Sequence, residues 1–157
     1  THTADKKGDK FMGKIKSKDE VLAEVYRNAQ LALQSISDIL PETEEDGIRK
    51  EILRQQSEYK RICEDAEKIA RQSGIELKEP GLFKKAMMWS GIKMNTVVDK
   101  SSQHIAQLMV RGTAMGVTSL RTTQTDSEGY ADGEIKKLLD ELIAREEEFE
   151  ENLKKFL

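Results

Sequence analysis

The stretch "SSQHIAQLMVRGTAMGVTSL", residues 101–120, is typical of a helix, yet its middle carries glycines where large apolar side chains are expected. Gly112 and Gly116 are four residues apart and so share one face. A glycine inside a helix costs roughly 1 kcal/mol relative to alanine, and a compensating contact is therefore needed. We expect a second helix to approach this face closely. That helix belongs either to the same bundle, which we favour, or to a second subunit.

The flanking sequence predicts three more long helices. In the first, "SKDE" places Glu20 three residues after Ser17, a capping-box pattern, and apolar residues recur at spacings of three and four as far as Pro41. The second opens with "PETEED" and stops at Gly74, because glycine favours a helix C-terminus. The helix around the opening stretch is expected to start at Asn95 or Thr96 and to end near Thr122, and the last to cover residues 133–157.

These helices predict an all-α fold, an up-down-up-down four-helix bundle built from residues 17–157 as one domain. A short amphipathic helix, residues 82–94, is expected in the crossover between the second and third long helices. Residues 1–16 are polar and lysine-rich without periodicity, which predicts a disordered basic tail. The composition agrees with a helical protein, since 35% of the residues are charged and only 2 are proline.

Charge and cysteine content narrow the functional classes. A net charge of −3 does not indicate a nucleic-acid partner. One cysteine, Cys63, cannot form an internal disulfide and fits a reducing compartment. No apolar run has the length of a membrane span, and no signal-peptide pattern precedes the first helix. We therefore expect a cytoplasmic protein.

A four-helix bundle raises the question of a di-iron site, which needs inward glutamates and two Glu-x-x-His motifs. No Glu-x-x-His is present; the two histidines are His2, in the tail, and His104, which has Ser101 three residues before it. Only Glu146 interrupts an apolar stripe, between Leu142 and Phe149. The sequence therefore predicts no metal, no cofactor and no enzymatic activity. Glu146 is expected to pair with Arg111 or to face solvent at the bundle edge.

The helix order, "GLFKKAMMW" and the glycine in "VRGT" resemble bacterial ferritin-like families of uncharacterised function, and "GIKMNTVVDKSSQHIAQLMVRGTAMGV" resembles a group of uncharacterised Firmicutes bundle proteins. The resemblance covers roughly residues 17–157. It implies a ferritin-like fold in which the metal-ligand positions are largely substituted. Those positions would fall on Gln30, Gln56, Tyr59, Thr113, Glu146 and Phe149.

Two groups of residues are candidates for binding. Buried amides and phenols need partners, which predicts a polar core layer or a ligand pocket made by Gln55 or Gln56, Tyr59, Thr113 and His104. The short helix could contact a partner or an anionic membrane, or cover the end of the bundle; its candidate residues are Lys84, Lys85, Met87, Met88 and Trp89.

A structural or interaction protein is the function that the sequence favours, with a homo-oligomer or another protein as partner. Two alternatives stay open. One is a metal or redox protein with a degenerate carboxylate site at Glu146. The other is a small-ligand carrier with a polar pocket around Gln56, Tyr59 and Thr113.

Overall fold

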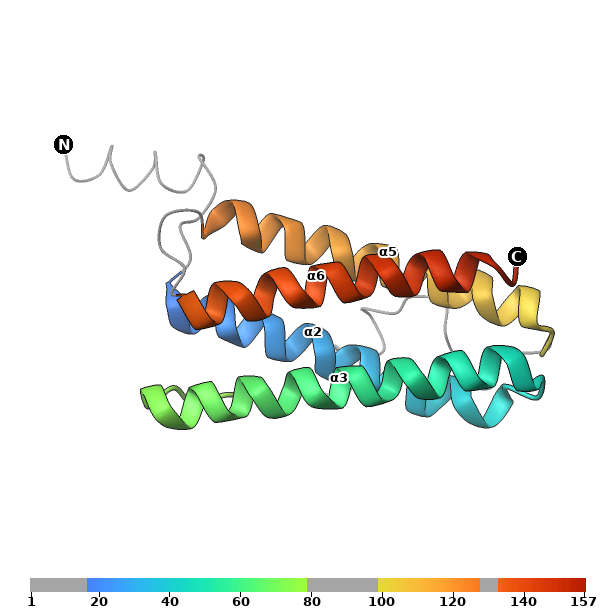
Figure 1. Ribbon diagram of the computed structural model, residues 1–157, viewed down its shortest axis with the longest axis horizontal. Helices are drawn as coiled ribbons and strands as arrows, with labels where there is room; N and C mark the ends of the chain where they lie inside the picture. Colours follow the sequence, from blue (N-terminus) through green and yellow to red (C-terminus); the bar gives the residue numbers. More distant parts are fainter. Residues whose placement is uncertain (1–16, 79–98, 128–132) are drawn as a thin grey trace.

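The computed structural model describes residues 17–78, 99–127 and 133–157, and nearly all of them are helical (Figure 1). No strand occurs within these ranges, so the predicted all-α class is confirmed. The elements are α2 (Lys18–Ile39), the short 3-10 helix η1 (Leu40–Glu42), α3 (Asp46–Ser73), α5 (Ser102–Asp126) and α6 (Gly133–Lys154). The expected tail, residues 1–16, and the expected short helix, residues 82–94, lie outside the described residues.

The ends of α2 and α3 follow local sequence signals closely. The capping box is present, because the Glu20 amide donates to Ser17 Oγ at 3.3 Å and the Ser17 amide donates to Glu20 Oε1 at 3.2 Å. Gly74 ends α3 in the left-handed conformation with φ of +67°. The start of α3 was predicted too early. Pro41 lies in η1, and α3 begins at Asp46 with Glu45 as its N-cap.

The bounds of α5 also differ from the expectation. Ser101 caps this helix, since its Oγ accepts a hydrogen bond from the His104 amide at 3.2 Å. Residues 99–101 are therefore not helical, and Asn95 and Thr96, the expected caps, lie outside the described residues. At its other end α5 continues to Asp126, beyond the expected stop near Thr122. No glycine or proline interrupts residues 117–126, so no residue there breaks the helix.

The order of helix directions is up, down, down, up, and the predicted up-down-up-down order is wrong. Each neighbouring pair of helices is antiparallel, because residues later in one helix contact residues earlier in the other. As a result α3 and α5, which lie diagonally across the bundle, run in the same direction (Figure 1). The contacts that fix these directions are Tyr26–Glu67, Arg49–Leu40, Asn28–Gly116, Lys100–Glu42, Arg54–Glu148, Arg61–Glu141, Arg121–Glu147 and Gln124–Asp140.

The length of one connection explains this error. α5 begins beside Glu42 and Glu45, at the end of the bundle opposite to the one where α3 stops, and residues 74–101 connect the two helices. A helix with the 28 residues of α3 is about 42 Å long at 1.5 Å per residue, a distance that roughly 13 extended residues can cover. The connection is long enough, so α5 is free to run parallel to α3.

The core is an apolar column along the bundle axis. The predicted stripe of α2 is buried, and so is the stripe of α6, where Leu142 and Phe149 are 0% exposed. Cys63 is buried within this core. Halfway along the bundle polar side chains interrupt the column.

Candidate functional site

A polar layer crosses the centre of the bundle and takes residues from all four helices. Its members are Asn28 from α2, Tyr59 from α3, Thr113 and Gly116 from α5, and Glu146 from α6. The four side chains are between 1% and 4% exposed. Because buried polar groups need hydrogen-bonding partners, the contacts within this layer decide what it can do.

Glu146 and Tyr59 form the central contact. The Tyr59 hydroxyl donates to Glu146 Oε2 at 2.8 Å. Phe149, one turn along α6, packs edge-on against the Tyr59 ring with centroids 5.3 Å apart, and the Arg54 guanidinium carbon lies 5.4 Å from the Phe149 centroid. These contacts hold the Tyr59 phenol next to the Glu146 carboxyl group.

The expected position of Glu146 was wrong. It neither faces solvent nor pairs with Arg111, because Glu146 is 1% exposed and Arg111 lies on the outer surface of α5. The physical reason is its register, since Leu142 and Phe149 precede and follow it by about one turn on the same helix face. A residue between them must enter the core.

Gly116 provides the space for the carboxyl group. A Cβ atom added at this position would lie 3.0 Å from Glu146 Oε1, 3.3 Å from Glu146 Oε2 and 3.4 Å from Asn28 Nδ2. The helices that come close to Gly116 are α6 and α2 of the same bundle, and they do so through side chains, because the three nearest atoms belong to side chains and not to a backbone. Asn28 Nδ2 also donates to the Gly116 carbonyl at 3.2 Å, which links α2 to α5. Gly112 is buried one turn earlier.

Burial dominates the ionisation of the layer. Removal from water raises the pKa of Glu146 to about 8, and the Tyr59 hydrogen bond offsets only part of this effect. Burial, followed by the proximity of Glu146, raises the pKa of the Tyr59 hydroxyl well above 10.0. Both groups are therefore held in their neutral forms at neutral pH.

The other predicted core residues lie elsewhere. Gln56 is half-buried, whereas the adjacent Gln55 is buried and donates to Glu51 Oε2 at 2.9 Å. Gln30 is half-buried on α2. His104 is half-buried in the first turn of α5. Thr113 is buried on α5 three residues before Gly116, and its hydroxyl donates to the Met109 carbonyl of its own helix at 2.7 Å.

Asn28 was missed by the sequence argument. On α2 it occupies the place in the layer that had been assigned to Gln30. The signal was available, because Asn28 lies three residues after Val25 and four before Ala32, both on the apolar stripe. A polar residue within an apolar stripe would have identified it, as it identified Glu146.

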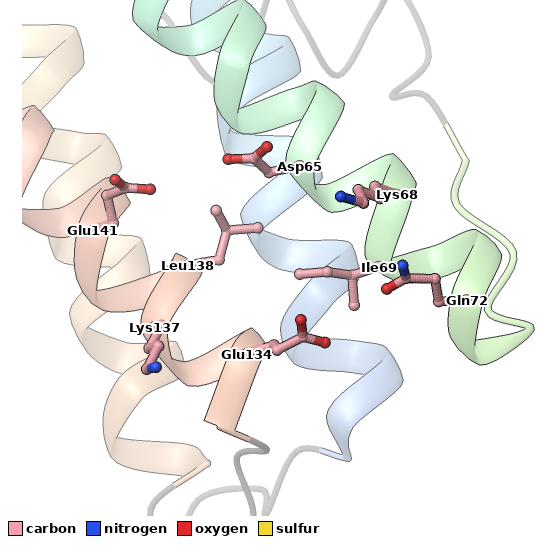
Figure 2. Close-up of a pocket in the computed structure, with 8 residues that line it drawn as sticks. All are labelled: Asp65, Lys68, Ile69, Gln72, Glu134, Lys137, Leu138 and Glu141. Atoms are coloured by element: carbon pink, nitrogen blue, oxygen red, sulfur yellow. The ribbon is translucent and has the colours of Figure 1, made fainter.

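Three hollows open on the described surface, two large and one small. One of the large hollows, of about 430 Å³, lies between the start of α3 and the end of α6. The other, of about 460 Å³, lies between the end of α3 and the start of α6, and in it Ile69 and Leu138 point toward each other (Figure 2). Charged and polar side chains surround them: Asp65, Lys68, Gln72, Glu134, Lys137 and Glu141. The small one, of about 60 Å³, lies between α2 and α5 and is lined by Glu24, Arg27, Asn28 and Ser119. Of these three hollows of the described residues, the small cleft alone is lined by a residue of the polar layer, Asn28.

Two features that the described residues lack bear on function. Across residues 17–78, 99–127 and 133–157, no three His, Cys, Asp or Glu side chains gather closely enough to hold a metal ion. Within the same ranges, no helix is both long and apolar enough to cross a membrane. The candidate surface residues Lys84, Lys85, Met87, Met88 and Trp89 lie outside these ranges.

Comparison with known proteins supports the fold alone. The chain is similar to the crystal structure of a conserved hypothetical protein, rv2844, from Mycobacterium tuberculosis, with a TM-score of 0.66 and 12% sequence identity. The similarity covers 87% of this chain and 94% of that one. No protein-family model matches the sequence, and no curated protein matches it significantly. The fold is therefore a helical bundle that a Mycobacterium tuberculosis protein also has, and these comparisons assign no activity to it.

Proposed function

We propose that this protein is a ferritin-like bundle that serves as a structural or interaction protein, and that its centre joins the helices instead of holding a metal pair. The connectivity supports the ferritin-like relationship, because ferritin-like bundles have one long crossover connection. Residues 74–101 provide such a connection between α3 and α5.

The surroundings of Glu146 carry this proposal. A di-metal site places carboxylates and imidazoles from four helices around one point. Here Glu146 faces a phenol, an amide and a glycine, supplied by Tyr59, Asn28 and Gly116. Glu146 is thus the one carboxyl group in the described layer. One carboxyl group is too few to hold two metal ions.

Metal titration tests this reading. The purified full chain is incubated with Fe(II), Mn(II) or Zn(II), desalted and analysed for metal, alongside Glu146→Gln and Glu147→Gln. Glu147 is the matched control, since it is the next residue on α6 and is exposed. We expect no stoichiometric metal in any sample. One or two metal ions per chain, lost in Glu146→Gln and retained in Glu147→Gln, would establish the carboxylate-site alternative instead.

The outer face of α5 is the surface that best suits an interaction. Met115, Thr118, Thr122 and Thr125 form a stripe along it, and Met115 is 40% exposed. The three threonine hydroxyls donate to carbonyls one turn earlier on the same helix, at 2.9 to 3.1 Å. They are thus partly satisfied within the helix. The stripe presents methyl groups and a thioether, without a charge.

A second copy of the chain is the partner we propose for this stripe. Two stripes packed antiparallel about Thr118 would place Arg111 of one copy near Thr125 of the other, so no like charges would meet. The exposed face of α6 is less suitable, because Glu147, Glu148 and Glu151 would repel a copy of themselves.

Light scattering during size-exclusion chromatography, over a range of protein concentrations, measures this association. Met115→Glu should shift the wild-type oligomer to monomer. Leu53→Glu is the control, since Leu53 is 41% exposed on α3, away from the stripe. A wild-type monomer at every concentration, or equal effects of the two substitutions, would refute the proposed interface.

A further inference from the structure

Two buried polar atoms of the central layer have no hydrogen-bonding partner. They are Asn28 Oδ1 and Glu146 Oε1, on residues that are 4% and 1% exposed. Both side chains lie against Gly116, close to the point where its missing Cβ would be. An unsatisfied buried acceptor costs about 1–3 kcal/mol, and two such atoms in one layer require an explanation.

The side-chain hydrogen-bond donors of the layer already have acceptors. Asn28 Nδ2 donates to the Gly116 carbonyl, which fixes the orientation of the amide and leaves Oδ1 as an acceptor. The Tyr59 hydroxyl proton goes to Glu146 Oε2, and the Thr113 hydroxyl proton goes to the Met109 carbonyl. Among the described side chains of the layer, no other donor is directed at either unpartnered oxygen.

The charges around Glu146 also favour a neutral carboxyl group. In the part of the chain that the structure describes, the groups next to Glu146 from the other helices are Tyr59 of α3, Gly116 of α5 and Asn28 of α2. Among the described residues, Tyr59 is the one titratable group that affects the ionisation of Glu146. An ionised carboxylate buried without a cation is strongly unfavourable, and a neutral acid removes that penalty.

We propose that the central layer is a proton-binding site, in which Glu146 takes up one proton from solvent and donates it from Oε1 to Asn28 Oδ1, directly or through one water molecule. Both unpartnered atoms are then satisfied. The result is a continuous chain in which Tyr59 of α3 donates to Glu146 of α6, Glu146 to Asn28 of α2, and Asn28 to the Gly116 carbonyl of α5. One proton thereby joins all four helices.

The small cleft between α2 and α5 gives this site a route to solvent. It is lined by Glu24, Arg27, Asn28 and Ser119, and its volume of about 60 Å³ has room for water. Water reaching Asn28 through this cleft can exchange the proton without unfolding of the bundle. This inference is independent of the α5 interface, because it concerns each bundle by itself.

The site makes stability depend on pH with a definite sign. Burial raises the pKa of Glu146 from 4.5 to about 8, so between these values the folded chain holds the proton and the unfolded chain releases it. The stabilisation is complete below the unfolded pKa and is lost as pH rises through the folded pKa. In that window the equilibrium constant for unfolding should rise up to tenfold per pH unit.

Urea unfolding between pH 5.5 and 9 compares the wild type with Glu146→Gln and Glu147→Gln. Glutamine keeps both contacts, because its amide donates to Asn28 Oδ1 and its carbonyl accepts from Tyr59. We expect the wild-type unfolding constant, divided by that of Glu146→Gln, to rise about tenfold per pH unit up to about pH 8. Glu147→Gln should follow the wild type. A ratio that stays constant with pH would show that Glu146 is ionised in the folded protein.

A second measurement does not depend on the folding of Glu146→Gln. Carbon-13 NMR of the glutamate carboxyl groups in the folded wild type, with chelator present, should show one group titrating with a midpoint above pH 7. Asn28→Ala removes the acceptor of the neutral acid and should lower this midpoint. Titration of every glutamate below pH 5 would overturn the proton site, and an unchanged midpoint in Asn28→Ala would overturn the link to Asn28.

Discussion

Replacing Gly116 with alanine places one methyl group against the polar layer. The new Cβ would lie 3.0 Å from Glu146 Oε1 and 3.4 Å from Asn28 Nδ2. The carboxyl group cannot move away freely, because Tyr59 holds its other oxygen at 2.8 Å. The methyl group must therefore displace hydrogen-bonded atoms or push α5 outward.

Two opposing terms set the magnitude. Alanine gains roughly 1 kcal/mol over glycine within a helix. Overpacking a closed core costs about 1–3 kcal/mol, and here it also strains the bond from Tyr59 and the 3.2 Å bond from Asn28 to the Gly116 carbonyl. We expect a net loss of about 1 kcal/mol, which lowers the melting temperature by about 2–4 °C in a domain of this size.

Urea unfolding monitored by circular dichroism, at pH 6.5, measures the change. Gly47→Ala is the control, since its Cβ would lie 3.4 Å from Phe156 Cε1, an ordinary contact. It should leave stability unchanged or raise it. The same Gly116→Ala change in a Glu146→Ala background should be stabilising by up to about 1 kcal/mol, because the carboxyl group is gone. Stabilisation by Gly116→Ala in the wild type, equal to that in the Glu146→Ala background, would refute the contact.

Two further substitutions test the layer and the start of the bundle. Tyr59→Phe keeps the ring but leaves Glu146 Oε2 without its donor, so we expect a loss of about 1–3 kcal/mol in urea unfolding and a higher carbon-13 titration midpoint for Glu146; an unchanged midpoint would argue against the hydrogen bond. Ser17→Ala removes the capping box of α2 and should cost about 1 kcal/mol, whereas Ser57→Ala on the exposed face of α3 should not destabilise the protein.

The sequence by itself determined the local features of this protein. The capping pattern of Ser17 and Glu20 located the start of α2, and Gly74 located the end of α3, because capping depends on residues within one turn of each other. The apolar spacing within each helix identified its buried face for the same reason. The apolar spacing also placed Glu146 on the buried face of α6, although its assignment to the bundle edge was wrong.

Only the tertiary structure decided how those faces meet. The direction of α5 depends on the course of the long connection, residues 74–101, and not on any pattern within α5. Asn28, Gly116 and Glu146 are far apart in the sequence and converge through the packing of three helices. Helical spacing is set by hydrogen bonds between residues four apart, whereas the register between helices is set by many side chains packing together. The sequence therefore predicted four helices, and their packing created the polar site that joins them.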